Sequence, residues 1–230
     1  MKEKPVQNLQ DLYKEEYVER FEREQSSYRI GRLLQYIDLP NDADIADFGC
    51  GNGMLLPCLS DRVKRYSGVD FSGQFILAAR NRQKMQGIAN ADFFCESIES
   101  FCSRNRERFD AGFVLDLAEH IPDKEWSAIL TAIHRSLRPG GKLYLHTPNA
   151  MFFLEIMKRY DVILHQLEEH VAVRGVQENV RMLKEAGFSI TGIRLLPHYN
   201  ILQFIHVVSF LPVIGKYFKA RIFITAEKEI

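Results

Sequence analysis

The pattern of hydrophobic and polar positions divides this chain into two kinds of segment, which alternate along it. Short apolar runs, such as Ile45-Ala46 and residues 142–146, stand between longer stretches with helical spacing, such as 73–86 and 123–137. Apolar runs of that length between turn residues predict buried strands, and the longer stretches predict amphipathic helices. Regular alternation of the two predicts an α/β fold, in which helices cover both faces of a parallel sheet.

Turn and cap residues add limits to these elements. Ser72 is expected to cap the helix over 73–86, and Gly87 to end it. Asp123 is expected to cap the helix that runs to Leu137. We predict one domain over residues 1–230 with four parts: a helical N-terminal cap (1–40), a ligand-binding core (41–147), a lid insert (148–176) with a helix over 151–166, and a C-terminal part (177–230) with a helix over 178–186, antiparallel strands over 189–196 and 221–227, and an apolar insert over 197–220.

Composition and charge restrict the kind of protein and its partners. The 230 residues are 46% hydrophobic and 26% charged, as in ordinary soluble domains. The formal net charge is zero, so we expect no nucleic-acid partner. The four cysteines lack the paired spacing of a zinc site or a disulfide framework. No apolar stretch follows the polar start, which predicts a cytoplasmic protein without a signal peptide.

A glycine-rich segment carries the strongest chemical signal. Gly49, Gly51 and Gly53 follow an apolar run, and their alternate spacing lets the backbone bend sharply beside a ligand. The N–H groups of the helix expected to follow would face that ligand. An acid, Asp70, ends the next predicted strand 21 residues after Gly49, where a carboxylate suits both hydroxyls of a ribose.

The residues around these glycines narrow the choice of nucleotide. A dinucleotide-binding motif needs its third glycine one position later, where Met54 stands. Asp47 lies two residues before the first glycine and would repel a pyrophosphate but attract a cationic amino group. The ligand indicated is a nucleoside that carries an amino acid and no phosphate.

At residues 47–53 the chain resembles the class I S-adenosylmethionine-dependent methyltransferases, whose first motif is acid-x-Gly-x-Gly-x-Gly. Segments 93–98, 109–121 and 137–143 are similar to later motifs of that family, so the resemblance covers about residues 28–147. It implies a doubly wound, Rossmann-like sheet of seven strands, mostly parallel with an antiparallel final strand. It also implies S-adenosylmethionine as cofactor and S-adenosylhomocysteine as product.

The resemblance assigns cofactor roles to individual residues. Asp47, the glycines and the small Cys50 would surround the methionine part, Asp70 the ribose, and Phe71 the adenine. Glu96 would accept the adenine amino group, with Ser97 and Ile98 over the ring, although Ile98 suits the core equally well. In similar ubiquinone-biosynthesis O-methyltransferases, an arginine at the position of Arg29 meets the methionine carboxylate; a surface charge is the alternative. The full set is Arg29, Asp47, Gly49, Cys50, Gly51, Gly53, Asp70, Phe71, Glu96, Ser97, Ile98 and Leu115.

Three histidines are candidate proton acceptors. His120 follows the fourth predicted strand, His146 ends the fifth, and His170 resembles the histidine before the last helix of many small-molecule methyltransferases. Histidine can take a proton near neutral pH, but a base is needed only if the acceptor must lose one. Glu119-His120 alternatively only shapes the pocket. We expect no metal site, because Asp116 alone does not reproduce the acidic set of the cation-dependent O-methyltransferases.

The apolar insert is the main indication of the acceptor. Residues 201–214 are too few to span a bilayer. They would form a lid helix, a dimer interface, or a surface that contacts membrane or a lipophilic substrate, with Lys216, Lys219 and Arg221 toward headgroups.

The predicted function is methyl transfer to a small, partly lipophilic molecule at a hydroxyl oxygen, by a monomer or homodimer. N- or C-methylation, a lipid or lipid-linked glycan acceptor, and a regulatory protein that only binds S-adenosylmethionine are the alternatives. Asp47 and Met54 disfavour a nicotinamide-dependent oxidoreductase.

Overall fold

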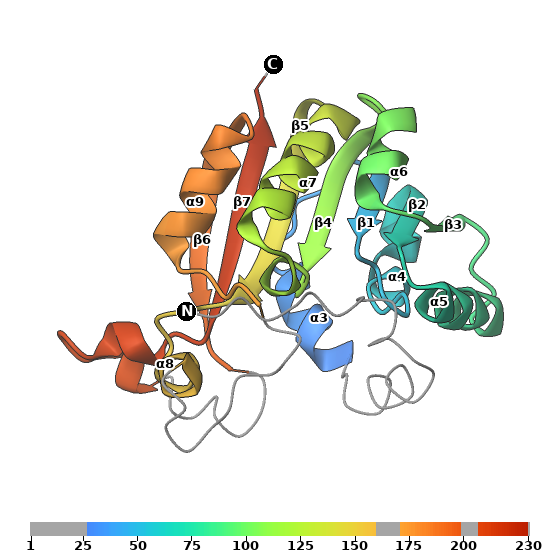
Figure 1. The fold of residues 1–230 in the computed structure, drawn as a ribbon. Helices are drawn as coiled ribbons and strands as arrows, with labels where there is room; N and C mark the ends of the chain where they lie inside the picture. The colour runs from blue at the N-terminus through green and yellow to red at the C-terminus, as the bar shows by residue number, and fades with distance from the viewer. Residues whose placement is uncertain (1–26, 160–170, 199–206, 230) are drawn as a thin grey trace. The chain divides into compact units, whose positions relative to one another are not determined.

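The structure, a computed structural model, describes residues 27–159, 171–198 and 207–229 (Figure 1). The backbone divides into two compact units, Met1–Phe101 and Cys102–Ile230. The prediction of a single domain stays a prediction. Most of the predicted N-terminal helical region, the second half of the predicted helix over 151–166, and the first part of the apolar insert lie outside the described residues.

The first unit is built around three parallel strands in the order β3-β2-β1. Its core contains aromatic side chains from all three strands, among them Phe48, Tyr66 and Phe93. Helix α5 begins after Ser72, whose hydroxyl accepts a hydrogen bond from the Phe75 N–H, and it ends before Gly87, as predicted. The elements are α3 (Ser27–Leu34), β1 (Ala43–Phe48), α4 (Leu56–Leu59), η1 (Ser60–Arg62), β2 (Val63–Asp70), α5 (Gly73–Met85), β3 (Ala91–Cys95) and the start of α6 (Ile98–Arg104).

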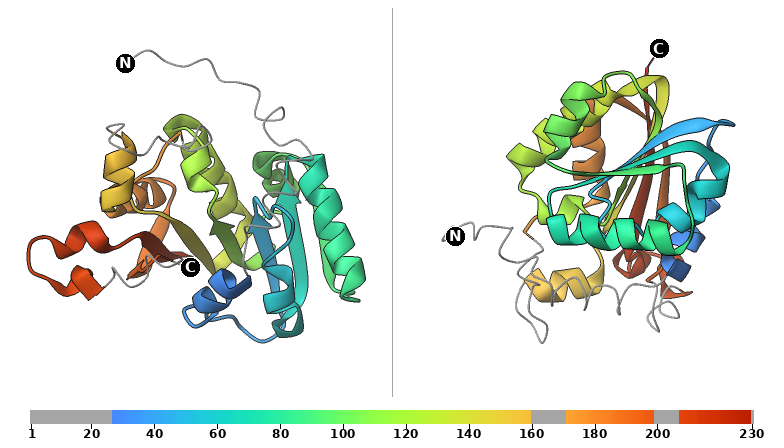
Figure 2. Two further views of the ribbon diagram at one scale, coloured as in Figure 1. Left: turned by 90° about the horizontal axis from the view of Figure 1, so that it is seen from below. Right: turned by 90° about the vertical axis from the view of Figure 1, so that its right-hand side faces the viewer.

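The second unit contains four strands in the order β4-β5-β7-β6, of which β4 and β5 are parallel and β7 is antiparallel to both of its neighbours. Helices α7 and α9 pack beside each other on one face of these strands (Figure 1; Figure 2). Stacked rings of Phe113, Tyr144 and Phe223 join β4, β5 and β7. The elements are β4 (Phe109–Leu115), η2 (Ala118–His120), α7 (Asp123–Ser136), β5 (Leu137–Pro148), α8 (Phe153–Arg159), α9 (Val176–Glu185), β6 (Phe188–Leu196), η4 (Gly215–Phe218) and β7 (Arg221–Lys228).

These strands confirm the predicted fold class, a seven-stranded mixed sheet with an antiparallel final pair. Two boundaries differ from the prediction. Pro122, and not Asp123, is the residue before α7, and Asp123 instead places its carboxylate against Arg174. Strand β5 begins at Leu137 and not at the predicted residue 142. A bulge opposite Phe109 and Ala111 lets the glycine-containing segment before residue 142 stay in the sheet.

Candidate functional site

The glycine turn of the first unit adopts the backbone conformation that its sequence predicts. Gly49, Gly51 and Gly53 all have positive φ, at 72°, 50° and 72°, a region that residues with a Cβ rarely enter. The N–H groups of Gly49 and Cys50 donate to the Val69 carbonyl oxygen at 2.8 and 3.0 Å, which ties the turn to the end of β2.

The three glycines do not all serve the same purpose. A Cβ on Gly53 would lie 3.1 Å from the Ala79 Cβ and 3.2 Å from the Phe93 Cζ, so this position is crowded by helix α5 and strand β3. The sequence predicts that all three glycines keep the backbone open toward a ligand. The structure adds a packing reason for Gly53, because a larger residue there would push α5 away from the strands.

Asp70 connects three loops at the carboxyl ends of the parallel strands. Its Oδ2 accepts a hydrogen bond from the Gly51 N–H at 3.0 Å, and its Oδ1 accepts one from the Ser72 N–H at 2.9 Å. Its backbone carbonyl accepts a third from the Glu96 N–H at 3.1 Å. The side chain predicted to bind a ribose is therefore held at the centre of the loops predicted to hold the rest of the nucleoside.

Two buried carboxyl groups give this end of the unit an unusual electrostatic character. The pKa of Asp47 is raised to about 7, mainly by burial and to a smaller extent by nearby Asp70, against a hydrogen bond from the Tyr66 hydroxyl. Burial also raises the pKa of Asp70 to about 6, against the hydrogen bonds from Ser72 and Gly51. A cationic ligand group beside these residues would favour their ionised forms, so the site suits a ligand with positive charge and disfavours phosphate.

The remaining predicted adenine residues lie at the ends of β2 and β3. Phe71 keeps 36% of its surface exposed directly after Asp70, as a ring available to a ligand would. Glu96 is half-buried, and the Ser97 hydroxyl accepts the Ser100 N–H within the first turn of α6. Ile98 is buried in the core, which favours the core alternative for that residue. Arg29 belongs to helix α3, and its side chain lies outside the described residues.

The second unit has its own polar cluster where β4 and β5 end. Asp116 follows β4 with a positive φ of 55°, which is uncommon for a residue other than glycine. Its Oδ1 accepts a hydrogen bond from the Arg221 guanidinium at 3.0 Å and lies 2.9 Å from His146 Nδ1. The cofactor residue predicted just before it, Leu115, ends β4 opposite His146.

Glu119 completes this cluster and is almost fully buried, at 2% exposed. Its Oε2 accepts a hydrogen bond from the Thr147 hydroxyl at 3.1 Å. The pKa of Glu119 is raised to about 8, mainly by burial and secondly by the charge of Asp116, whereas Arg221 and Thr147 oppose the shift. A carboxyl group held neutral at pH 7 can donate as well as accept a hydrogen bond. Sequence reasoning treated Glu119 only as a companion of His120.

The raised pKa of Glu119 predicts a pH dependence of stability. An acid whose pKa rises from 4.5 in the unfolded chain to about 8 in the folded protein keeps its proton on folding. Its contribution to stability is therefore present at low pH and is lost as the pH rises between those values, by up to about 1.4 kcal/mol per pH unit. We expect Glu119→Gln to reduce this slope in denaturation measurements made across that range. The exposed Glu125→Gln on α7 should keep the wild-type slope, and parallel curves for all three proteins would contradict the prediction.

The three candidate histidines occupy different surroundings. His120 is half-buried at the end of η2, next to Glu119. His146 is completely buried within β5 beside Asp116, so a ligand would meet it only through that cluster. His170 lies outside the described residues. Their catalytic roles stay predictions.

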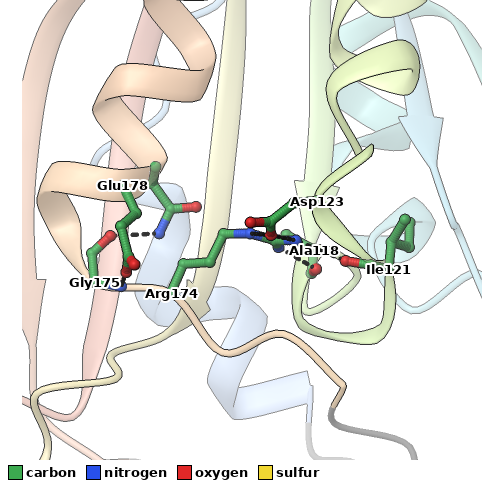
Figure 3. A network of polar contacts seen from close by, with 7 residues as sticks. Ala118, Ile121, Asp123, Arg174, Gly175 and Glu178 are labelled. Carbon is green, nitrogen blue, oxygen red and sulfur yellow. Dashed lines mark hydrogen bonds and ion pairs between the residues drawn. The ribbon is translucent and has the colours of Figure 1, made fainter. Parts of the chain in front are cut away.

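Arg174 holds the loop that carries Glu119 and His120, and sequence reasoning missed it. Its guanidinium donates to the carbonyl oxygens of Ala118 and Ile121, each at 2.7 Å, and to Asp123 Oδ1 at 2.9 and 2.7 Å (Figure 3). The next residue, Gly175, donates its N–H to the Glu178 side chain in the first turn of α9. The contacts of Arg174 therefore lie directly before the start of this helix. No periodicity or local motif marks this arginine, since its partners lie 51–56 residues away.

Among the described residues, no group of three or more His, Cys, Asp or Glu side chains could hold a metal ion. The described helices also include none that is long and apolar enough to cross a membrane.

Comparison with known proteins shows what this chain is similar to. Residues 45–141 match a family described as "Methyltransferase domain". The chain is 31% identical over 121 residues to the ubiquinone biosynthesis O-methyltransferase of Idiomarina loihiensis, covering 53% of this chain and 49% of that protein. It is 32% identical over 108 residues to the Coxiella burnetii enzyme of the same name, covering 47% of this chain and 44% of that one. The chain thus spans about half the length of the relatives it matches.

Solved structures share the fold at low sequence identity. The magnesium protoporphyrin IX methyltransferase of Synechocystis, crystallised with bound S-adenosylhomocysteine, has a TM-score of 0.70 at 18% identity over 96% of this chain and 98% of that one. The [4+2]-cyclase SpnF has a TM-score of 0.67 at 16% identity over 89% of this chain and 81% of that one. At such identities the likeness supports the fold alone.

Proposed function

We propose that this chain is an S-adenosylmethionine-dependent methyltransferase that transfers a methyl group to a hydroxyl oxygen of a small, partly lipophilic molecule. The observation that carries the proposal is the Asp70 arrangement. Its buried carboxylate joins the glycine turn to the loop after β2, and its backbone carbonyl oxygen joins the loop after β3. The first motif and the ribose-binding acid of the family belong at these loops.

The residues present fit S-adenosylmethionine. The positive-φ glycines turn the chain sharply after β1, and the buried carboxyl groups of Asp47 and Asp70 favour a cationic ligand. Bound S-adenosylmethionine would supply a methyl group already activated by its sulfonium charge. The protein would then act mainly by holding the acceptor in line with that methyl group, which can supply much of the rate enhancement.

An oxygen acceptor is favoured by the polar cluster of the second unit together with the relatives. A phenolic or alcoholic hydroxyl must lose a proton during transfer, and His120 would accept it. The neighbouring Glu119, with its raised pKa, could hydrogen-bond the acceptor oxygen as a donor. The name shared by the most similar relatives, ubiquinone biosynthesis O-methyltransferase, supports oxygen methylation and a lipophilic acceptor.

A protein that binds S-adenosylmethionine without methyl transfer is the second candidate. The observation that favours it is the similarity in fold to a [4+2]-cyclase, because this fold does not by itself determine the reaction.

The two candidates are separated by an assay with radiolabelled S-adenosylmethionine. We expect label to enter lipophilic catechols and phenols but not matched amines or carboxylic acids. We also expect His120→Ala to lower kcat and to change KM much less. The loss of kcat should be largest at pH values below the pKa of the acceptor hydroxyl. Tight S-adenosylmethionine binding without transfer to any acceptor class would favour the second candidate.

A further inference from the structure

A group of large apolar side chains is exposed just before η4 in the second unit. We call this group, Val207, Phe210, Leu211, Val213 and Ile214, the apolar projection. Val213 is 86% exposed and Phe210 81%, whereas most large apolar side chains of this unit are buried. The chain here stands off from strands β6 and β7 (Figure 1; Figure 2, left view). Clustered apolar exposure of this kind marks an interaction surface.

The projection has a defined backbone conformation. Leu211 donates its N–H to the Val208 carbonyl oxygen at 3.0 Å, and its own carbonyl oxygen accepts the Gly215 N–H at 3.0 Å. Val213 has a φ of 65°, which is rare for a β-branched residue and persists only where the surrounding structure imposes it. A Cβ on Gly215 would lie 2.3 Å from the Ser209 carbonyl oxygen, so glycine is required for this close turn. The strained turn keeps Val213 directed to solvent.

The base of the projection is fixed to the sheet. The Asn149 side chain, just after β5, donates to the Lys219 carbonyl oxygen at 2.8 Å. The Asn149 N–H donates to the Ala220 carbonyl oxygen at 3.0 Å, directly before β7. These contacts hold the apolar side chains on a stable support.

The charged residues within the segment that carries the projection indicate what it contacts. Residues 207–220 contain no Asp or Glu, although the whole chain has equal numbers of acidic and basic residues. Lys216 is exposed, with its ammonium 5.0 Å from the centre of the Tyr217 ring, and Lys219 is half-buried nearby. Apolar side chains with adjacent cations match the acyl region and the anionic headgroups of a lipid surface.

A protein partner is less consistent with this surface. Stable protein interfaces use about 20–30 residues on each side and have a polar rim with hydrogen-bonding groups of both kinds. The apolar projection has five apolar residues on a protruding turn, and the charged residues within 207–220 are two lysines.

We propose that the apolar projection inserts into the interfacial layer of a membrane that contains anionic lipid, with Lys216 and Lys219 at the headgroups. Phe210 and Val213 would enter deepest, because they are the most exposed apolar side chains of the group. This proposal concerns binding alone and does not depend on the acceptor of the proposed reaction.

Vesicle sedimentation with the full chain tests the proposal. We expect the protein to sediment with vesicles of phosphatidylcholine and phosphatidylglycerol, and much less with phosphatidylcholine alone or at high salt. The double variant Phe210→Ser, Val213→Ser should lower the partition coefficient at least about tenfold. Lys216→Glu should weaken binding to the anionic vesicles only. The matched control is Leu77→Ser, Met85→Ser, which removes two exposed apolar side chains of helix α5 in the first unit and should bind as the wild type does.

Three results would overturn the proposal. The wild type could fail to bind anionic vesicles, the α5 control could lose binding equally, or the apolar projection could instead drive self-association. The last case would appear as a concentration-dependent mass in light scattering that the double variant removes. S-adenosylmethionine binding is measured on every variant. Unchanged binding confirms that the variant is folded and separates this test from that of the proposed function.

Discussion

Replacing Asp70 by alanine is expected to lower the affinity for S-adenosylmethionine at least about hundredfold. The carboxylate would accept hydrogen bonds from two ribose hydroxyls, and each hydrogen bond to a charged group contributes about 1.5–3 kcal/mol. Losing two such bonds exceeds the 2.7 kcal/mol that corresponds to a hundredfold change. Calorimetry should be performed near pH 8, above the pKa of about 6 at Asp70, so that the wild-type carboxylate is ionised.

The control for this result is Asp92→Ala, which removes an exposed acid from β3 and should leave the affinity unchanged. Asp70 also accepts the N–H groups of Gly51 and Ser72, so the melting temperature of each variant must be measured alongside. A folded Asp70→Ala protein that binds S-adenosylmethionine as tightly as the wild type would remove the main support for the proposed function. So would a folded wild type that binds neither the cofactor nor S-adenosylhomocysteine.

Arg174→Met is expected to destabilise the protein by about 3 kcal/mol. The guanidinium is 5% exposed, and its loss leaves the carbonyl oxygens of Ala118 and Ile121 without the donor they now have. Each buried polar group left without a partner costs about 1–3 kcal/mol. For a chain of this length the melting temperature should fall by about 6–12 °C. Thermal and urea denaturation measure the change.

Arg181→Met is the matched control, because Arg181 forms an exposed pair with Glu185 one turn along α9. Such pairs contribute about 0.3–0.5 kcal/mol, so its melting temperature should change little. Similar losses for the two variants would show that the Arg174 contacts contribute no more than a surface ion pair does. Arg174→Lys should recover only part of the stability, since an ammonium cannot reproduce the forked contacts to two carbonyl oxygens and a carboxylate.

The sequence alone determined the elements, the glycine turn and the position of Asp70 in the first unit. Strand ends, the glycine turn and the cap at Ser72 are local, because each depends on the conformational preferences of a few consecutive residues. Asp70 was found for a related reason. In parallel strands the residues after each carboxyl end share one edge, so its spacing from Gly49 was enough to place it beside the turn.

Only the tertiary structure decided which distant side chains meet. Arg221 reaches Asp116 across 105 residues, and Thr147 reaches Glu119 across 28, through the register of β4, β5 and β7. That register is set by the packing of the whole sheet. Asp123 shows the same limit, because it was expected to cap a helix and instead binds Arg174.

The sequence also did not determine which apolar side chains are exposed to solvent. The sequence left the apolar insert open as a lid, an interface or a membrane contact, since hydrophobic composition does not say whether neighbours cover a side chain. The strained turn at Val213 and the close approach of Gly215 to Ser209 decide that these apolar side chains face solvent. Local preference therefore specified the strands and the glycine turn, whereas long-range packing set the burial of Glu119, the position of Arg174 and the exposure of the apolar projection.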